Sequence, residues 1–254
     1  MNDLASHDTP WLAVADLHGH RAHFNALLGW AEAEFGAQLR VCTLGDYVDN
    51  GREIPALLDD LIALRERLGE RFVPILGNHD LALLRSLGWP GAVPDEAWYQ
   101  RWSRNYWNAG LGTPAAYGAR TLAEFVAHFP VHHRAFLASL PWMHDTGRWL
   151  FVHAGMEPGP LAPQRTALEA KRLPAQHEWL PPQLRERALS TASDAAWDRV
   201  VISAHNKHLG GPRFEGPNRI CLSGEVDATG VLRAVVLPAR TFVRVTADGR
   251  VTAD

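Results

Sequence analysis

Two aspartates, Asp46 and Asp49, lie three residues apart in the stretch GDYVDNG (45–51), directly after a short apolar run. Neighbouring carboxylates raise each other's pKa, so such a pair needs a cation, a histidine partner or free access to solvent. Glycine, aspartate and asparagine also favour ordinary surface turns. From this stretch alone, the two aspartates could belong either to a functional site or to a solvent-exposed turn.

Side chains of the same kinds follow the other apolar segments of the chain. Asp16 and His18 follow 11–15, Asp46 and Asp49 follow 40–44, Asn78, His79 and Asp80 follow 71–76, His153 follows 148–152, and His205 follows 199–203. In open α/β sheets, ligands bind at the carboxyl ends of the strands. The pattern predicts that these side chains meet at one end of a sheet.

These residue types suit a divalent metal centre. Carboxylate oxygens, amide oxygens and neutral imidazoles bind zinc, manganese and iron, and one ion needs only three or four protein ligands. The chain offers more ligands than that, which favours two ions, roughly 3.5–4 Å apart, that share a carboxylate and lower the pKa of a bound water. We expect Asp46 to be the shared carboxylate, with its charge offset by both ions.

The elements that must position these residues alternate between short apolar runs and helical patterns. The runs 11–15, 40–44 and 71–76 predict buried strands, and apolar residues at three-to-four spacing predict helices between them. This alternation is typical of an α/β fold with parallel pairing. The tryptophan-rich segment from about 80 to 146 has no clear strand, and we expect a mostly helical insertion. Later apolar runs, at 148–152, 199–203, 218–223, 231–237 and 241–247, also predict strands. For the runs from 199 to 247 we expect antiparallel pairing and a second sheet.

Length, charge and composition bear on the number of domains, the kind of partner and the compartment of the protein. The 254 residues fit a single domain over 1–254, and the net charge of -3 with no basic run argues against a stable nucleic-acid partner. No apolar run is long enough to span a membrane, and the N-terminus lacks the pattern of a signal peptide. Cys42 and Cys221 lie in apolar runs, as expected of buried free thiols, so we expect a cytoplasmic protein.

Five ordered motifs resemble the calcineurin-like metallophosphoesterases. They are DLHGH (16–20), GDYVDNG (45–51), GNHD (77–80), HAG (153–155) and AH (204–205). The likeness runs from about residue 12 to 237. It is strongest to the branch that contains PPP-type serine/threonine phosphatases and bacterial diadenosine tetraphosphatases. The resemblance implies a four-layer α/β/β/α sandwich of two mixed sheets flanked by helices, with the segment 80–146 as a helical insertion.

The resemblance also implies a role for each motif residue. Asp16 and His18 would hold one metal, Asp46 would bridge, and Asn78, His153 and His205 would hold the other. A hydroxide between the metals would attack phosphorus. His79 would act as general acid and Asp49 would orient it. Two ions of manganese, iron or zinc are expected, with their identity open.

This chain departs from the family at three arginine positions that clamp phosphate oxygens. Asn50 and Leu76 replace two of them, and proline stands in the counterpart of the third, EWLPP (178–182). Each lost guanidinium would cost about 1.5–3 kcal/mol of binding, which should weaken selectivity for a dianionic phosphomonoester. Arg52 and Lys207 are candidate replacements, although each also suits an ordinary surface position.

Three hypotheses follow for the function. The favoured one is a phosphomonoesterase similar to the serine/threonine protein phosphatases. The second is a dinucleoside polyphosphate hydrolase or phosphodiesterase. The third is a non-catalytic metal-binding scaffold, which would not need the pair of His79 and Asp49. The expected partner is a phosphorylated small molecule, nucleotide or protein, and the oligomeric state is open.

Overall fold

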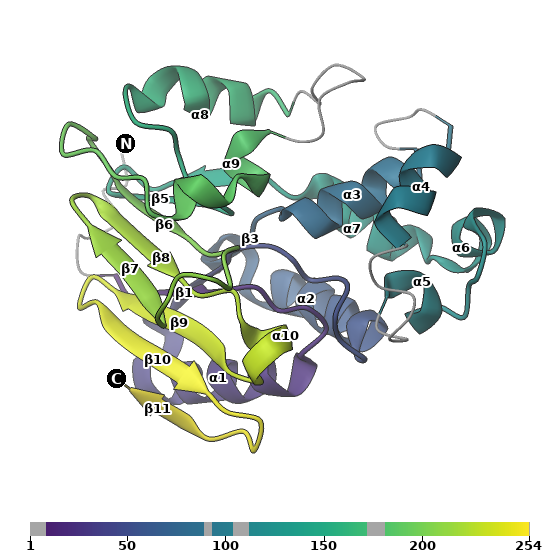
Figure 1. Ribbon diagram of the computed structural model, residues 1–254. Helices are drawn as coiled ribbons and strands as arrows, with labels where there is room; N and C mark the ends of the chain where they lie inside the picture. The colour runs from purple at the N-terminus through teal and green to yellow at the C-terminus, as the bar shows by residue number, and fades with distance from the viewer. Residues whose placement is uncertain (1–8, 89–92, 104–111, 172–180, 254) are drawn as a thin grey trace.

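The computed structural model describes residues 9–88, 93–103, 112–171 and 181–253. Two β-sheets lie face to face with helices on their outer sides (Figure 1), which confirms the predicted α/β/β/α sandwich. In spatial order, the first sheet contains β11 (Val251–Ala253), β10 (Thr241–Val245), β9 (Leu232–Leu237), β1 (Trp11–Val14), β2 (Arg40–Thr43) and β3 (Phe72–Pro74). The second contains β4 (Met143–Asp145), β5 (Trp149–Val152), β6 (Val200–Ser203), β8 (Arg219–Leu222) and β7 (Arg213–Gly216).

Strand direction brings the predicted site residues together. β1, β2 and β3 are parallel, with Trp11 paired to Arg40 and Val41 to Phe72. β5 and β6 are parallel in the second sheet. The carboxyl ends of β1, β2 and β3 therefore share one end of the first sheet, and those of β5 and β6 share one end of the second.

The central strands use their two faces for different cores. In β1, Trp11 and Ala13 face the space between the sheets, while Leu12 and Val14 pack toward the helices. The period of two residues that defines a strand produces this split. Cys42 and Cys221 are free and buried, and burial raises the pKa of both thiols.

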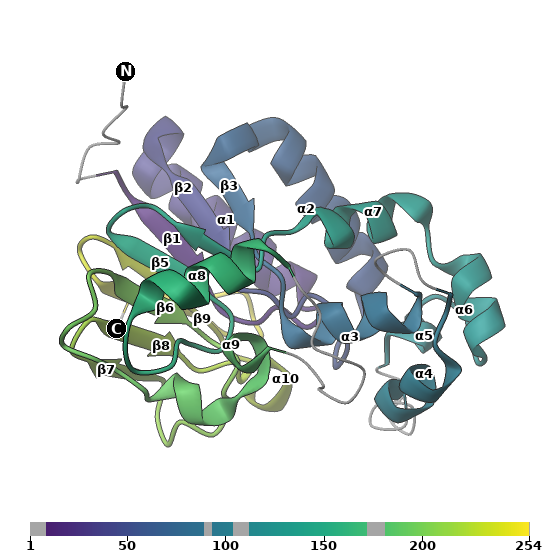
Figure 2. The same cartoon turned by 90° about the horizontal axis from the view of Figure 1, so that it is seen from above.

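The helices cover the outer faces of the sandwich. α1 (Arg21–Phe35) and α2 (Ile54–Leu68) pack on the first sheet, and α8 (Leu161–Glu169) and α9 (Pro182–Arg185) lie over the second (Figure 2). The apolar positions predicted for the second helix are all buried: Ile54, Leu57, Leu58, Leu61, Leu64 and Leu68. A short helix, α10 (Val226–Thr229), precedes β9. Within the described ranges, no helix has the length and apolar content to cross a bilayer.

The predicted insertion is helical and forms a lobe beside the sandwich (Figure 1). It contains α3 (Asn78–Ser86), α4 (Glu96–Ser103), α5 (Thr113–Ala116), α6 (Leu122–His128) and α7 (Val131–Ser139). Its end differs from the expectation, because residues 143–145 form β4, which pairs antiparallel with β5.

Two further differences concern the C-terminal strands. β9 and β10 were expected in the second sheet, but β9 pairs antiparallel with β1 and extends the first. Four of the six residues of β9 form an apolar run at its end, and that run cannot show which sheet the strand joins. β7 has no apolar run because it is an edge strand with partly exposed residues, so the sequence pattern did not reveal it.

Candidate active site and metal centre

A cavity of about 420 Å³ opens where the strand ends of both sheets meet. Eight of the residues singled out from the sequence line it: Asp16, His18, Asp46, Asn50, Asn78, His79, His205 and Lys207. His153 and Asp49 are fully buried close by. Arg52 is exposed and is not among the lining residues.

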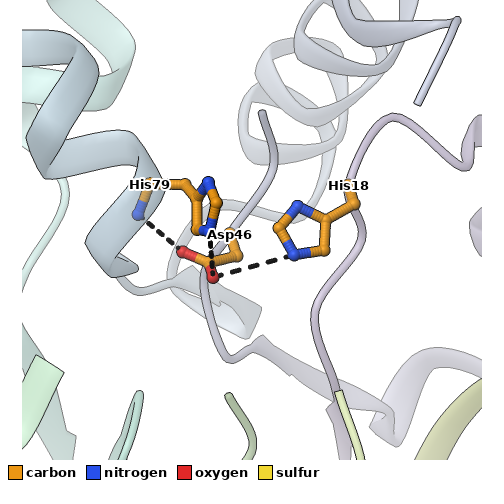
Figure 3. Close-up of side chains that lie close together, drawn as sticks. All are labelled: His18, Asp46 and His79. Carbon is orange, nitrogen blue, oxygen red and sulfur yellow. Dashed lines mark hydrogen bonds and ion pairs between the residues drawn. The ribbon is translucent and has the colours of Figure 1, made fainter. Parts of the chain in front are cut away.

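Asp46 lies at the centre of the cluster. Its Oδ2 is 3.2 Å from His153 Nε2, 3.8 Å from His18 Nε2 and 3.9 Å from His79 Nε2. Figure 3 shows His18, from the loop after β1, and His79, from the first turn of α3, converging on this carboxylate. His153 Nε2 is also 3.0 Å from Asn78 Oδ1. Such separations between donor atoms are those of side chains that share an ion at roughly 2.0–2.2 Å from each.

The outer ring nitrogens of the histidines are held by backbone carbonyls. His18 Nδ1 donates to Val48 O (2.7 Å), His153 Nδ1 to Leu44 O (2.6 Å), and His205 Nε2 to Arg185 O (2.8 Å). Metal-ligating histidines have this arrangement, because it fixes the tautomer and leaves the other nitrogen lone pair for the metal.

Two buried carboxylates supply the negative charge. Asp16 and Asp46 are each 1 % exposed, and among the described residues neither forms an ion pair with Lys or Arg. Burial raises the pKa of Asp16. Burial also acts on Asp46, but His153, His79 and His18 outweigh it and hold its pKa well below the usual range. Buried carboxylates beside imidazoles fit the donor set of a divalent metal centre.

The backbone around the cluster adopts a rarely populated conformation. Among non-glycine residues, φ is positive at His18 (39°), Asp46 (54°), Asp49 (64°), Asn50 (61°) and His205 (75°). Asp, Asn and His tolerate this region better than other residues, and strained backbone clusters at functional sites. Four of these five side chains, all except that of Asp49, line the cavity.

Glycines let the carboxylates approach the backbone closely. A Cβ at Gly77 would lie 2.1 Å from Asp46 Oδ1, and one at Gly224 would lie 2.2 Å from Asp16 Oδ2. Both distances are far inside van der Waals contact. Gly224 follows β8, and the sequence reasoning had not connected it with the site.

Asp80 ties together the loops that carry Asp46 and Asn78. Its Oδ2 accepts from the backbone N–H groups of Asp46 and Gly77 (both 2.9 Å), and its Oδ1 accepts from Tyr47 N–H (3.0 Å). Burial and the charge of Asp46 raise the pKa of Asp80 to about 7. Asp80 therefore acts on the candidate ligands through their backbone.

His79 and Asp49 form a hydrogen-bonded pair next to this cluster. His79 Nδ1 lies 2.8 Å from Asp49 Oδ2, and its Nε2 faces the Asp46 carboxylate (Figure 3). Burial lowers the pKa of His79, but Asp46 and Asp49 outweigh it and raise the pKa to about 9. Cations on Asp46 would offset part of that increase.

Two arginines that the sequence reasoning missed also line the cavity. Arg185 is the last residue of α9 and Arg187 lies in the turn that follows, both shortly after EWLPP (178–182) in the sequence. Lys207 lies in the cavity as well, with Nζ 3.2 Å from Asp227 Oδ2. No family motif marks residues 185–187, so only the fold could place them.

A second histidine cluster lies on the surface between α2 and α7. Asp59 Oδ1 is 2.8 Å from His133 Nε2 and 3.3 Å from His132 Nε2, and Tyr117 OH bonds His133 Nδ1 (2.7 Å). Both nitrogens of His133 are thus satisfied within the protein. We interpret this cluster as a structural link between the helices.

Comparison with known proteins agrees with this geometry. Residues 9–231 match the calcineurin-like phosphoesterase family. The chain belongs to that family. The family and the clustered donors together support a metal-dependent phosphoester hydrolase.

Individual relatives are similar over parts or the whole of the chain. A symmetrical bis(5'-nucleosyl)-tetraphosphatase of Paraburkholderia phymatum is 47% identical over 73 residues, which cover 29% of this chain and 24% of that protein. A solved candidate diadenosine tetraphosphatase has a TM-score of 0.59 at 19% identity, covering 96% of this chain and 95% of its own. A Saccharomyces cerevisiae serine/threonine phosphatase has a TM-score of 0.53 at 15% identity, covering 99% and 81%. The two structures support the fold alone.

Substitution of Gly224 by alanine tests the packing under Asp16. The new methyl group would displace the Asp16 carboxylate, so Gly224→Ala should retain less manganese than the wild type after loading and desalting. Elemental analysis measures this. Gly211→Ala is the matched control, because a Cβ there meets nothing within 4 Å. Full metal content in Gly224→Ala would contradict the assignment of Asp16.

Metal binding should depend on pH through His153. Burial opposes its protonation, but Asp46 outweighs burial and raises the pKa to about 9 in the metal-free protein. Below that pH the metal must displace a proton, so manganese affinity should rise about tenfold per pH unit between pH 7 and 9. Binding titrations at several pH values measure the slope, and a pH-independent affinity would rule out displacement of this proton.

Proposed function

We propose that this protein hydrolyses dinucleoside polyphosphates or related nucleotide polyphosphates. The observation that carries the proposal is the pair of guanidiniums, Arg185 and Arg187, at the rim of the cavity that holds the candidate metal ligands. The partial match to a symmetrical bis(5'-nucleosyl)-tetraphosphatase supports the same substrate class.

The charge distribution favours a substrate with several phosphates. Asn50, which is neutral, lies in the cavity where the protein phosphatases resembled here have an arginine. Arg185 and Arg187 are exposed, and within the described part of the chain neither forms an ion pair. Guanidiniums bind phosphate oxygens bidentately. Two of them at the rim suit the phosphates that extend beyond the one under attack, which a small monoester lacks.

The metal ligands divide between two ions in this proposal. Asp16 and His18 would hold one ion, Asp46 would contact both, and Asn78, His153 and His205 would hold the other. The ions, when bound, supply Lewis acidity and a water of lowered pKa. The protein contributes a fixed set of donors that line one cavity.

His79 would supply the proton that the leaving oxygen needs. Its Nδ1 is held by Asp49, so the proton on Nε2 points into the cavity. A raised pKa keeps that nitrogen protonated near neutral pH. A non-catalytic scaffold has no use for this pair, which is why we favour an enzyme over the scaffold hypothesis.

A substrate panel tests the proposed class. With manganese added, kcat/KM for diadenosine tetraphosphate should exceed kcat/KM for p-nitrophenyl phosphate, for its bis ester and for a phosphopeptide. A preference for the phosphopeptide would instead favour the phosphomonoesterase. Absence of turnover on every substrate, with metal content intact, would favour the scaffold.

Arg187→Ala tests the role of the rim. Loss of a charge-assisted hydrogen bond of about 1.5–3 kcal/mol should raise KM for diadenosine tetraphosphate by roughly 10- to 100-fold. The KM for p-nitrophenyl phosphate should change much less. Arg52→Ala is the matched control, because Arg52 is exposed nearby but does not line the cavity. Equal changes for both substrates would contradict a rim that recognises the polyphosphate chain.

A further inference from the structure

We propose that the helical insertion positions the general acid: Trp102 and Thr113 fix the Asp49 carboxylate that orients His79. Both are then positioning residues for hydrolysis. This inference rests on the proposed role of His79 as proton donor. It gives the tryptophan-rich insertion a function in addition to core packing.

Asp49 is held by four hydrogen bonds, two to each oxygen. Its Oδ1 accepts from the Thr113 hydroxyl (2.6 Å) and from the Thr113 backbone N–H (3.2 Å). Its Oδ2 accepts from Trp102 Nε1 (2.8 Å) and from His79 Nδ1 (2.8 Å). The Asp49 backbone N–H returns a hydrogen bond to the Thr113 hydroxyl (3.0 Å). Each carboxylate oxygen thus has two donors, and Asp49 is fully buried.

The donors come from distant parts of the chain. Asp49 lies between β2 and α2, and His79 lies in the first turn of α3. Trp102 lies in the last turn of α4, and Thr113 is the first residue of α5. Three of the four hydrogen bonds therefore come from α4 and α5, inside the insertion.

This arrangement fixes the direction of the His79 ring. A carboxylate with both oxygens saturated cannot rotate without losing a hydrogen bond, so Oδ2 stays where His79 Nδ1 needs it. Without the indole N–H, the carboxylate can turn and the His79 ring can follow it. Small misplacement of a catalytic group costs up to about 100-fold in rate.

A purely structural role for Trp102 is the competing explanation. Its ring packs with Tyr99 (centroids 6.3 Å apart) and Phe125 (5.9 Å). Trp98 provides a matched control on the same helix. It is also buried, at 4 % exposed against 6 % for Trp102, and its Nε1 donates to Ala82 O (2.8 Å). Replacement of either tryptophan by phenylalanine removes one buried indole hydrogen bond, but only one of these involves Asp49.

The decisive readout is dependence on the leaving group. A general acid matters for a poor leaving group such as phenolate and matters little for p-nitrophenolate. With aryl phosphate esters and manganese, we expect Trp102→Phe and Thr113→Val to lower kcat for the phenyl ester at least about tenfold. We expect kcat for the p-nitrophenyl ester to stay within about threefold. Trp98→Phe should affect both esters equally, Thr113→Ser should retain activity, and all variants should keep their metal.

His79→Ala separates this inference from the proposed function. If His79→Ala shows no leaving-group dependence, His79 is not the general acid and the positioning role fails with it. If His79→Ala shows that dependence but Trp102→Phe and Thr113→Val lose activity equally on both esters, only the positioning role is overturned. The same leaving-group pattern in Trp98→Phe would also overturn it, because the effect would then come from packing of α4.

Discussion

The arrangement of this site depends on one buried carboxylate, Asp46, that several imidazoles surround. A buried anion is costly unless positive charge or hydrogen bonds compensate it. Three histidine rings face its Oδ2, and the backbone N–H of His79 donates to its Oδ1 (2.9 Å). The outer ring nitrogens of His18 and His153 are already bonded to carbonyls, so their inner nitrogens are left for a cation. The rings therefore compensate the buried charge of Asp46, and Asp46 in turn sets the direction in which the rings point.

The sandwich provides what this carboxylate needs by joining loops from both sheets. Asp46 follows β2, whereas His153 and His205 follow β5 and β6. Glycine at 77 and at 224 allows carboxylates to lie against backbone that any side chain would push away. Left-handed backbone at Asp46 and His205 turns the side chains inward. Packing between the sheets holds these loops in place, so the strain is supported by the core and not by the site itself.

Much of this could be predicted from the sequence because its signals are local. β1, β2 and β3 are apolar runs, which predict an α/β fold, and the polar residues after the strands predict the clustering of Asp46 with His18 and His153. The two-sheet sandwich was implied by the resemblance of the motifs to the family. The sheet to which β9 belongs could not be predicted, because the sequence of a buried strand does not indicate which strands it pairs with. Arg185, Arg187 and Gly224 were also missed. These residues lie at the cavity only in the folded protein, and no sequence motif surrounds them. Trp102 was missed as well, because it reads as core packing although its indole N–H reaches Asp49.

In the proposed metal centre, Asp46 would contact two ions. A crystal structure with manganese, with anomalous scattering recorded to locate the metal, tests it most directly. We expect two anomalous peaks roughly 3.5–4 Å apart, with the Asp46 carboxylate between them and His153 beside one. A single peak, or peaks that Asp46 does not contact, would contradict it.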